Sequence, residues 1–215
     1  MIHICDDFLT DPYTVRNHAL KQKFITEEPF NYPGVRSSNI PSEIKDYISS
    51  YVNYITQKSS LREARYTGGG SFFQVMSKIY GEGQFHKDPH DYIFILYLSL
   101  DIPVDSGTEV CDYDHPALDT LLWASKLKDQ NITASYIDNQ KNSFHKDPHN
   151  LIKRYRYARL KEKINSYFKP IVKVPNKFNR ALFFPAHYYH RSQKSFGTSI
   201  TNSRLTLVSF IDEIN

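Results

Sequence analysis

Five short apolar runs after residue 70 constrain the fold of this chain most strongly. Each run is rich in β-branched and aromatic side chains and is bounded by Gly, Pro, Asn or Asp, a pattern typical of strands. Aromatic residues make up 14% of the sequence, which suits the half-buried faces of sheets. We therefore expect strands in SFFQVMSKIY (71–80), DYIFILYLSL (91–100), KPIVKVP (169–175), NRALFFP (179–185) and RLTLVSFIDE (204–213).

The first third of the chain has a helical character instead. TDPYTVRNHALKQKF (10–24) offers Thr10 or Asp11 as a cap, a proline in the first turn and apolar residues at helical spacing. PSEIKDYISSYVNYI (41–55) repeats the helical period. Between them, NYPGVRSSN (31–39) has the composition of a turn-rich loop. We expect these helices to support a β-core.

A long segment with two helical patterns separates the strands. These patterns are HPALDTLLWASKLKDQ (115–130) and HNLIKRYRYARLKEKINSYFK (149–169). Because loops tolerate insertions that cores do not, we interpret the segment as an insert in one β-core, and the length of 215 residues suits a single domain. The expected organisation is one domain over 1–215, with a helical support region at 1–67, a β-core at 68–111 and 170–215, and a helical insert at 112–169.

Polar residues before the second run have the spacing of metal ligands. His86 and Asp88 are two apart, so in an extended strand both side chains point to the same face. A third ligand must come from elsewhere, and His187 and His190 follow a later expected strand. Two histidines and one carboxylate on a triangular face are typical of non-haem Fe(II) sites that activate oxygen. For His90 we favour a polar loop residue or a partner of a ligand.

Arg204 begins the last expected strand, fourteen residues after His190. A guanidinium there could form a bidentate pair with the carboxylate of a cosubstrate. The alternatives are a solvated strand residue or a structural ion pair. For His86 and Asp88 the alternative is a surface pair at a strand end, because short motifs are weak alone. The order H-x-D, strand, distant histidine and arginine is more informative than any two of its parts.

These motifs together resemble the 2-oxoglutarate- and Fe(II)-dependent dioxygenase superfamily, in particular its prolyl-hydroxylase-like branch. IYGEGQFHKD resembles the lead into the H-x-D motif of that family, and ILYLSLDIPVDSGTEV resembles its tyrosine-bearing strand. LFFPAHYYH resembles the F-P-x-x-x-x-H motif, which selects His190 over His187, and SRLTLVSF resembles the R-x-S/T strand. The likeness covers about 70–111 and 170–211, and the N-terminus is similar to small bacterial and phage members.

The resemblance implies a mainly β fold with flanking helices (α+β), built on a double-stranded β-helix core of the jelly-roll or cupin-like type. It also implies an Fe(II) site formed by His86, Asp88 and His190. The distal carboxylate of 2-oxoglutarate would bind Arg204 with help from Tyr97, and Tyr80 would contact the keto-acid end. Aromatic packing is the alternative for both tyrosines.

The family's reaction couples O2 and the decarboxylation of 2-oxoglutarate to oxidation of a substrate, with release of succinate and CO2. Because Asp88 stands where a small residue would admit halide, the resemblance favours hydroxylation over halogenation. The substrate, a protein side chain or a small molecule, is not readable from the sequence. The insert could form a lid or wall over the iron.

A second FHKDPH at 144–149 repeats the first. It follows the polar DNQKNS and leads into a basic helical pattern, with no apolar strand behind it. Asp147 and Pro148 fit a helix N-cap with proline at the first position. We therefore interpret His145, Asp147 and His149 as loop or cap residues and not as a second metal site.

Two other function classes stay open. One is a catalytically inactive jelly-roll protein that binds or supports a partner. The other is a nucleic-acid binder that uses KRYRYARLKEK, in which Arg154, Arg156 and Arg159 alternate with aromatic residues. A net charge of +4 is too small to imply such a partner, and a solvated helix face is favoured.

The chain starts without the basic and apolar segments of an export signal, and no stretch approaches the run of about 18 apolar residues that a membrane span needs. We expect a soluble, cytoplasmic protein with no membrane partner. Cys5 and Cys111 are expected to stay reduced, without a role in the chemistry.

Overall fold

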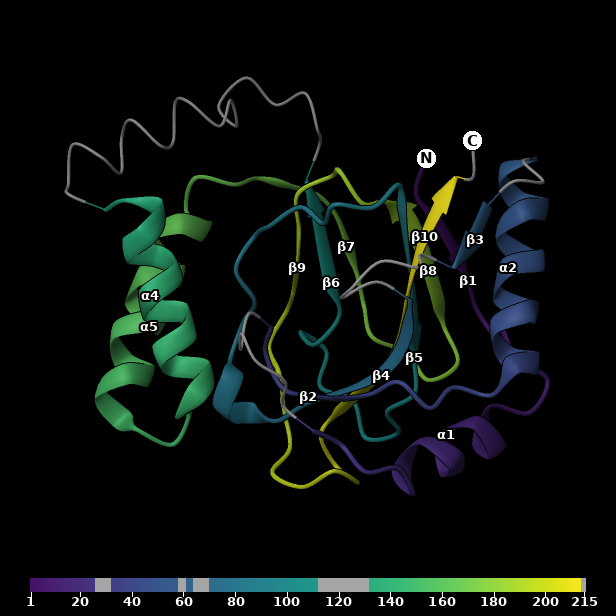
Figure 1. Ribbon diagram of the computed structural model, residues 1–215, viewed down its shortest axis with the longest axis horizontal. Coiled ribbons are helices and arrows are strands. Elements are labelled where there is room, and N and C mark those ends of the chain that lie inside the picture. Colours follow the sequence, from purple (N-terminus) through teal and green to yellow (C-terminus); the bar gives the residue numbers. More distant parts are fainter. Residues whose placement is uncertain (26–31, 58–60, 64–69, 112–131, 214–215) are drawn as a thin grey trace.

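Two antiparallel sheets with helices on both sides make up the described part of the chain, residues 1–25, 32–57, 61–63, 70–111 and 132–213 of a computed structural model (Figure 1). The strands are β1 His3–Cys5, β2 Val35–Ser37, β3 Leu61–Glu63, β4 Ser71–Met76, β5 Tyr92–Tyr97, β6 Thr108–Cys111, β7 Pro170–Val174, β8 Ala181–Pro185, β9 His190–Ser192 and β10 Arg204–Glu213. The helices are α1 Pro12–Leu20, α2 Ser42–Thr56, α4 Ala134–Lys146 and α5 Leu151–Asn165, with a 3-10 turn at Lys78–Tyr80.

The larger sheet has the strand order β1-β8-β5-β10-β4-β2, with β3 also paired to β10. The smaller sheet has the order β7-β6-β9. The long strand β10 lies between β4 and β5 and pairs with both over most of its length. Its side chains alternate, so Leu205 and Leu207 face one apolar cluster while Val208 and Phe210 face another. One sheet therefore has two different faces to fill.

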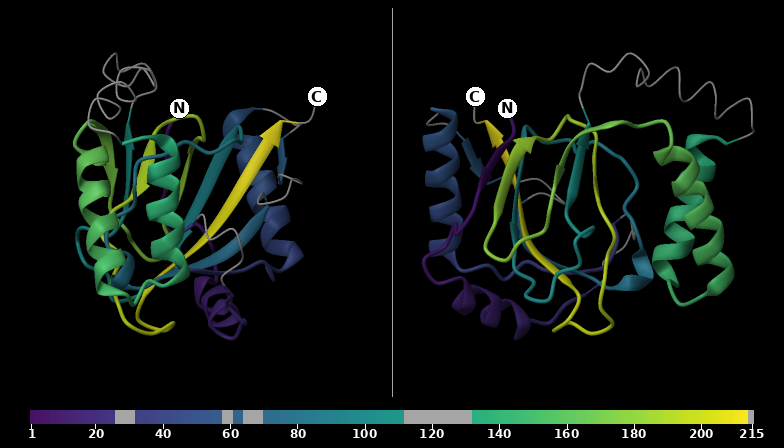
Figure 2. Two further views of the ribbon diagram at one scale, coloured as in Figure 1. Left: turned by 60° about the vertical axis from the view of Figure 1, so that its left-hand side comes forward. Right: turned by 180° about the vertical axis from the view of Figure 1, so that it is seen from behind.

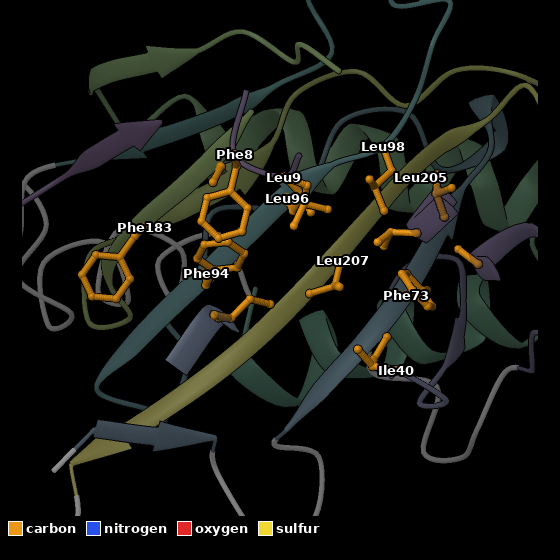
Figure 3. Packing of buried hydrophobic residues seen from close by; sticks show 14 of the residues in the cluster. Phe8, Leu9, Ile40, Phe73, Phe94, Leu96, Leu98, Phe183, Leu205 and Leu207 are labelled. Carbon is orange, nitrogen blue, oxygen red and sulfur yellow. The ribbon is translucent and has the colours of Figure 1, made fainter. Parts of the chain in front are cut away.

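The first face is covered by α1 and α2. Phe94 of β5 and Leu207 of β10 pack there against Phe8, Ile48 and Val52. The labelled side chains in Figure 3 interdigitate over the strands, and Phe8 lies 5.1 Å from Phe94 between ring centres. Each large side chain that is fully buried in this way contributes about 1.5–3 kcal/mol. The helices thus anchor the back of the sheet.

The second face of the larger sheet meets the smaller sheet. Ile93 and Phe184 from the larger sheet share a buried cluster with Val110 of β6 and Val174 of β7. This cluster occupies only part of the space between the sheets, and a pocket opens beside it.

The helices α4 and α5 stand on the opposite side of the sheets from α2 (Figures 1 and 2). They pack on the β-core through Phe144 and Tyr157, which share a buried cluster with Phe85, Phe168 and Tyr189. The rings of Phe85 and Phe168 stack at 4.8 Å. The described part of the insert is therefore joined to the segment that carries the H-x-D motif.

The expected mainly β architecture with flanking helices is confirmed. All five expected strands exist, although β4 ends at Met76 and the residues after it form the 3-10 turn. The interpretation of 31–39 as loop alone is wrong, because Val35–Ser37 pairs with β4 as β2. The helical pattern at 115–130 lies outside the described residues. The two helices of the first third are confirmed, and Asp11 caps α1 through the backbone N–H of Thr14.

The prediction that Asp147 caps the second insert helix is wrong. Helix α4 continues to Lys146, and the backbone N–H of Asp147 donates to the Phe144 carbonyl, so Asp147 ends that helix. Asn150 caps α5, because its side chain accepts from the backbone N–H groups of Ile152 and Lys153. Asp147 instead pairs with Lys153, and the two charged atoms lie 3.1 Å apart.

Neither cysteine forms a disulfide in the structure; Cys111 is buried and Cys5 is half-buried. In the part of the chain that the structure describes, no helix combines the length and the apolar character required to cross a bilayer.

Replacement of Phe94 by alanine tests the importance of the cluster under α1 and α2. Phe94 is fully buried, so the cavity left behind should lower the free energy of unfolding by about 3–5 kcal/mol, as urea denaturation would measure. The control is Tyr54→Ala on α2, whose side chain is 81% exposed and whose loss should change stability by at most about 0.5 kcal/mol. Equal effects of the two substitutions would contradict this description of the core.

Candidate metal centre

A pair of backbone hydrogen bonds brings His86 and His190 together. The N–H of His86 donates to the carbonyl of His190 at 3.1 Å, and the N–H of His190 donates to the carbonyl of His86 at 2.9 Å. This isolated antiparallel bridge places the two imidazole rings 4.4 Å apart between centres. Asp88 is held nearby by a backbone bond to Ala186, which belongs to the same distal motif.

The carboxylate of Asp88 completes the cluster. Its Oδ2 lies 3.1 Å from Nε2 of His190 and 3.7 Å from Nε2 of His86. One possible ligand atom from each of the three residues lies within 4.8 Å of the other two. Within the described residues, this is the one cluster of His, Cys, Asp and Glu with such a geometry. The two residues of the H-x-D motif and the distal histidine thus lie together in the folded chain.

The hydrogen bonds behind the rings determine which nitrogen faces the centre. Nδ1 of His86 lies 2.9 Å from the Gln84 carbonyl, and Nδ1 of His190 lies 2.9 Å from the Tyr188 carbonyl. Because a carbonyl only accepts, Nδ1 carries the proton in each neutral ring, and Nε2 keeps its lone pair. Both Nε2 atoms lie on the side of Asp88, as metal-binding histidines require.

The charges around the cluster favour the forms that bind a metal. Burial alone would raise the pKa of Asp88, but the rings of His86 and His190 outweigh it and hold that pKa well below its usual range. The His86 side chain is 51% exposed toward the opening, yet the protein around it lowers its pKa, and the neighbouring His190 adds to the effect. An ionised carboxylate beside two imidazole Nε2 atoms is a suitable donor set for a divalent cation.

Arg204 lies in the same pocket at the start of β10 and is only 3% exposed. Its Nε donates to the Ser106 carbonyl at 3.2 Å, and its guanidinium carbon lies 5.6 Å from the centre of the Tyr97 ring. Burial lowers its pKa, and no acidic side chain of the described residues acts on it. The interpretation of Arg204 as solvated or as half of an ion pair therefore does not fit. A buried cation without an anion is costly unless a ligand supplies one.

Thr206 is a residue of this region that sequence reasoning did not single out. It follows Arg204 by two positions on β10, so it shares the face of that strand. Its side-chain hydroxyl is buried and has no hydrogen-bond partner. The R-x-S/T pattern contained the signal, but burial without a partner is visible only in the structure.

The two tyrosines take different positions. Tyr97 is fully buried, and its hydroxyl donates to Oγ1 of Thr108 at 2.7 Å beside Arg204. Burial raises the pKa of Tyr97, which keeps the hydroxyl protonated. Tyr80 lines the pocket and packs edge-on against the Phe144 and His145 rings of α4.

The remaining histidines stay outside the cluster. His90 lies 3.2 Å from the carboxylate oxygens of Asp212 and stacks on Phe210, so it has a structural role at the pocket wall. His187 is exposed and packs against the Tyr188 ring. The expectation for the second FHKDPH is partly wrong: His145 is buried in the last turn of α4 and lines the pocket, although it joins no metal cluster.

The pocket has a volume of about 760 Å³ and extends from the cluster to the insert. Side chains of α4 and α5, including Lys141, His145 and Tyr157, form one wall. Lys161 of α5 is buried, and its ammonium donates to the carbonyls of Tyr80 and Glu82 in the segment before His86. Burial lowers the pKa of Lys161 to about 8. Residues of the insert therefore form part of the pocket that contains the cluster.

Ion pairs behind His190 fix the strand that carries it. Arg191 donates through Nε to Glu109 of β6 at 2.7 Å and through its terminal nitrogen to Glu82 at 2.7 Å. Lys173 of β7 also reaches Glu109, at 3.1 Å. Burial would raise the pKa of Glu109, but Arg191 and Lys173 outweigh it and lower that pKa.

No protein-family model matches the sequence, and no curated protein matches it. Solved structures do share its fold. HygX from Streptomyces hygroscopicus with nickel and 2-oxoglutarate bound superimposes with a TM-score of 0.58 at 10% identity, over 99% of this chain and 82% of that chain. The non-heme alpha ketoglutarate dependent epimerase SnoN from nogalamycin biosynthesis gives 0.54 at 9% identity, over 99% and 77%. AviO1 from Streptomyces viridochromogenes Tue57 gives 0.53 at 9% identity, over 99% and 89%. At these identities the likeness defines the fold and not the reaction.

Glu109→Gln tests the ion pairs behind His190. The substitution leaves Arg191 partly buried without its main anion, and we expect a loss of about 2–3 kcal/mol of unfolding free energy at pH 7. Because the folded-state pKa of Glu109 is lowered, its contribution is complete above the ordinary value of 4.5 and is lost as the pH falls through the folded-state pKa.

The difference from wild type should therefore shrink at acidic pH. Urea denaturation at several pH values measures it, and Glu162→Gln in the exposed Arg159–Glu162 pair is the control with little effect. A difference that stays constant down to the acid range would contradict the ion-pair explanation.

Proposed function

We propose that this protein is an Fe(II)- and 2-oxoglutarate-dependent dioxygenase that hydroxylates an organic substrate. The observation that carries the proposal is the convergence of His86, Asp88 and His190 in one pocket with a buried guanidinium that has no acidic partner. The facing antiparallel sheets support a double-stranded β-helix, and the solved structures of similar fold include two whose names give 2-oxoglutarate or its synonym.

The donor set fits Fe(II). Two Nε2 atoms and a carboxylate are the donor types of the facial triad of non-haem iron sites, which leaves positions open for other ligands. When bound, Fe(II) with 2-oxoglutarate and O2 supplies an oxidising centre, and succinate and CO2 are released. His86, Asp88 and His190 would hold the ion, and the carbonyls behind the histidines would keep each ring in its ligating tautomer.

The pocket also fits the distal carboxylate of 2-oxoglutarate. Arg204 supplies the positive charge and parallel N–H donors, and Thr206 supplies a free hydroxyl from the same face of β10. The hydroxyl of Tyr97 stays protonated, and the Tyr97 ring lies beside the guanidinium of Arg204. Tyr80 lies in the same pocket, and its contact to the keto-acid end remains a prediction.

The nucleic-acid alternative depends on the basic and aromatic residues of KRYRYARLKEK forming one exposed surface. Tyr157 of the KRYRYARLKEK run is buried against the core, so the aromatic residues do not form a continuous exposed strip. Arg159 pairs with Glu162 on the same helix. A solvated helix face accounts for these residues, and the inactive jelly roll remains the rival that experiment must exclude.

Anaerobic titration with Fe(II) and 2-oxoglutarate tests the proposal. The chelate of the two on iron gives a visible charge-transfer band, which we expect in wild type and not in His86→Ala or His190→Ala. Arg204→Ala should weaken the affinity for 2-oxoglutarate. His187→Ala is the matched control, because this exposed histidine lies in the same motif outside the cluster. A well-folded wild type without the band would support the inactive rival.

Thr206→Val tests the cosubstrate subsite more finely. Valine keeps the shape of threonine but removes the hydroxyl, so the affinity for 2-oxoglutarate should fall about tenfold while metal affinity stays constant. Stability in the absence of ligands should not fall, because the hydroxyl has no protein partner to lose. Calorimetric titration and thermal unfolding measure the two effects. A destabilised protein with unchanged affinity would assign Thr206 a structural role instead.

A further inference from the structure

The wall that the insert contributes to the pocket carries a positive charge. Lys141 of α4 lines the pocket together with His86 and Asp88. Burial lowers the pKa of Lys141, and the charges of Asp138 and Asp88 oppose this effect without outweighing it. Among the described residues, Lys141 forms no salt bridge and no side-chain hydrogen bond.

Several other cations of the pocket already have partners: the guanidinium of Arg36 lies over the rings of Tyr32 and Phe72, and the ammonium of Lys87 lies over the Tyr189 ring. Lys161 binds the carbonyls of Tyr80 and Glu82, and Arg191 binds two glutamates. Arg204 lies deeper, beside Tyr97, where the proposed cosubstrate uses it. Lys141 is instead presented from the helix pair, on the side of the metal cluster that faces the insert. A half-buried ammonium without a partner is unfavourable unless a ligand provides an anion.

The floor of the same pocket is apolar. It is formed by large side chains of β4, β5 and β10 that point away from the helix-covered face, namely Phe72, Ile93, Ile95, Val208 and Phe210. A pocket of this volume is large enough for a small molecule, whose apolar part can lie on this floor while the polar groups of the walls set its orientation. An elongated ligand could therefore lie on the strands and direct one end toward α4.

We propose that the primary substrate is a small organic anion, whose acidic group pairs with Lys141 while its apolar body lies on this floor. Lys141 is then a specificity-determining residue. The site of oxidation rests on the function proposed above, whereas the preference for an anion does not require the metal. The insert would thus select the substrate, and the β-core would hold the metal and cosubstrate.

Calorimetric titration with matched probes tests the preference. The probes are 4-phenylbutyrate and its uncharged amide, titrated into the full chain both without metal and with Fe(II) and 2-oxoglutarate under anaerobic conditions. Wild type should bind the acid about tenfold more tightly than the amide. Lys141→Gln should abolish this preference. Lys146→Gln is the control and should retain it, because Lys146 is an exposed residue of the same helix.

Reversal of the charge at position 141 should create affinity for a cationic probe, a result that a misfolded variant would not give. Lys141→Glu should bind 4-phenylbutylamine more tightly than 4-phenylbutyrate. Arg204→Gln excludes binding in the cosubstrate subsite, since it should leave the preference for the acid in place. Absence of binding of either probe to wild type, an unchanged preference in Lys141→Gln, or its loss in Arg204→Gln would each overturn the proposal. Failure of the proposed function would appear separately, as a missing charge-transfer band.

Discussion

The reciprocal pair of backbone hydrogen bonds between His86 and His190 is the constraint on which the rest of the site depends. It joins a segment in the middle of the chain to one near its end, and the rings meet because antiparallel neighbours share a face. Ala186 holds Asp88 in the same way, so main-chain atoms position all three side chains. Geometry of this kind does not depend on long flexible side chains. It is suited to a centre whose ligands must be ready before the ion arrives.

The negative charge of Asp88 and the positive charge of Arg204 lie at different places in the pocket. Asp88 stays ionised between two rings that each keep one free lone pair, and Arg204 stays charged at depth beside a protonated Tyr97. Between these two places the floor consists largely of apolar side chains of β4, β5 and β10, although Ser71 and Gln74 of β4 also line the pocket. A dianion that binds at both places would therefore be oriented mainly by its two charged ends.

Spacing alone left His187 and His190 open as the third member of the cluster, and the motif resemblance selected His190. The sequence was sufficient for the main strands and for His86 and Asp88, since strand runs and the H-x-D spacing are local patterns. It was insufficient where partners distant in the sequence decide the outcome. Val35–Ser37 is a strand only because β4 lies beside it, and nothing local distinguishes it from a loop. Asp147 suited a cap by sequence, but α4 continues to Lys146, and the next helix therefore begins after Asn150. The importance of Thr206 lies in a buried hydroxyl without a hydrogen-bond partner among the described residues, which no spacing encodes.

Lys161 gives the helical insert a mechanical role. Its ammonium donates to the carbonyls of Tyr80 and Glu82, so α5 is bonded at two points to the segment that leads into His86. The position of the Lys161 ammonium is restricted, because both of its acceptors are main-chain carbonyls, which cannot reorient by side-chain rotation. A variant with a shortened or exchanged insert would therefore need a replacement for the two hydrogen bonds of Lys161. A displacement of α5 would break these two hydrogen bonds, which lie next to the segment that carries the candidate ligand His86.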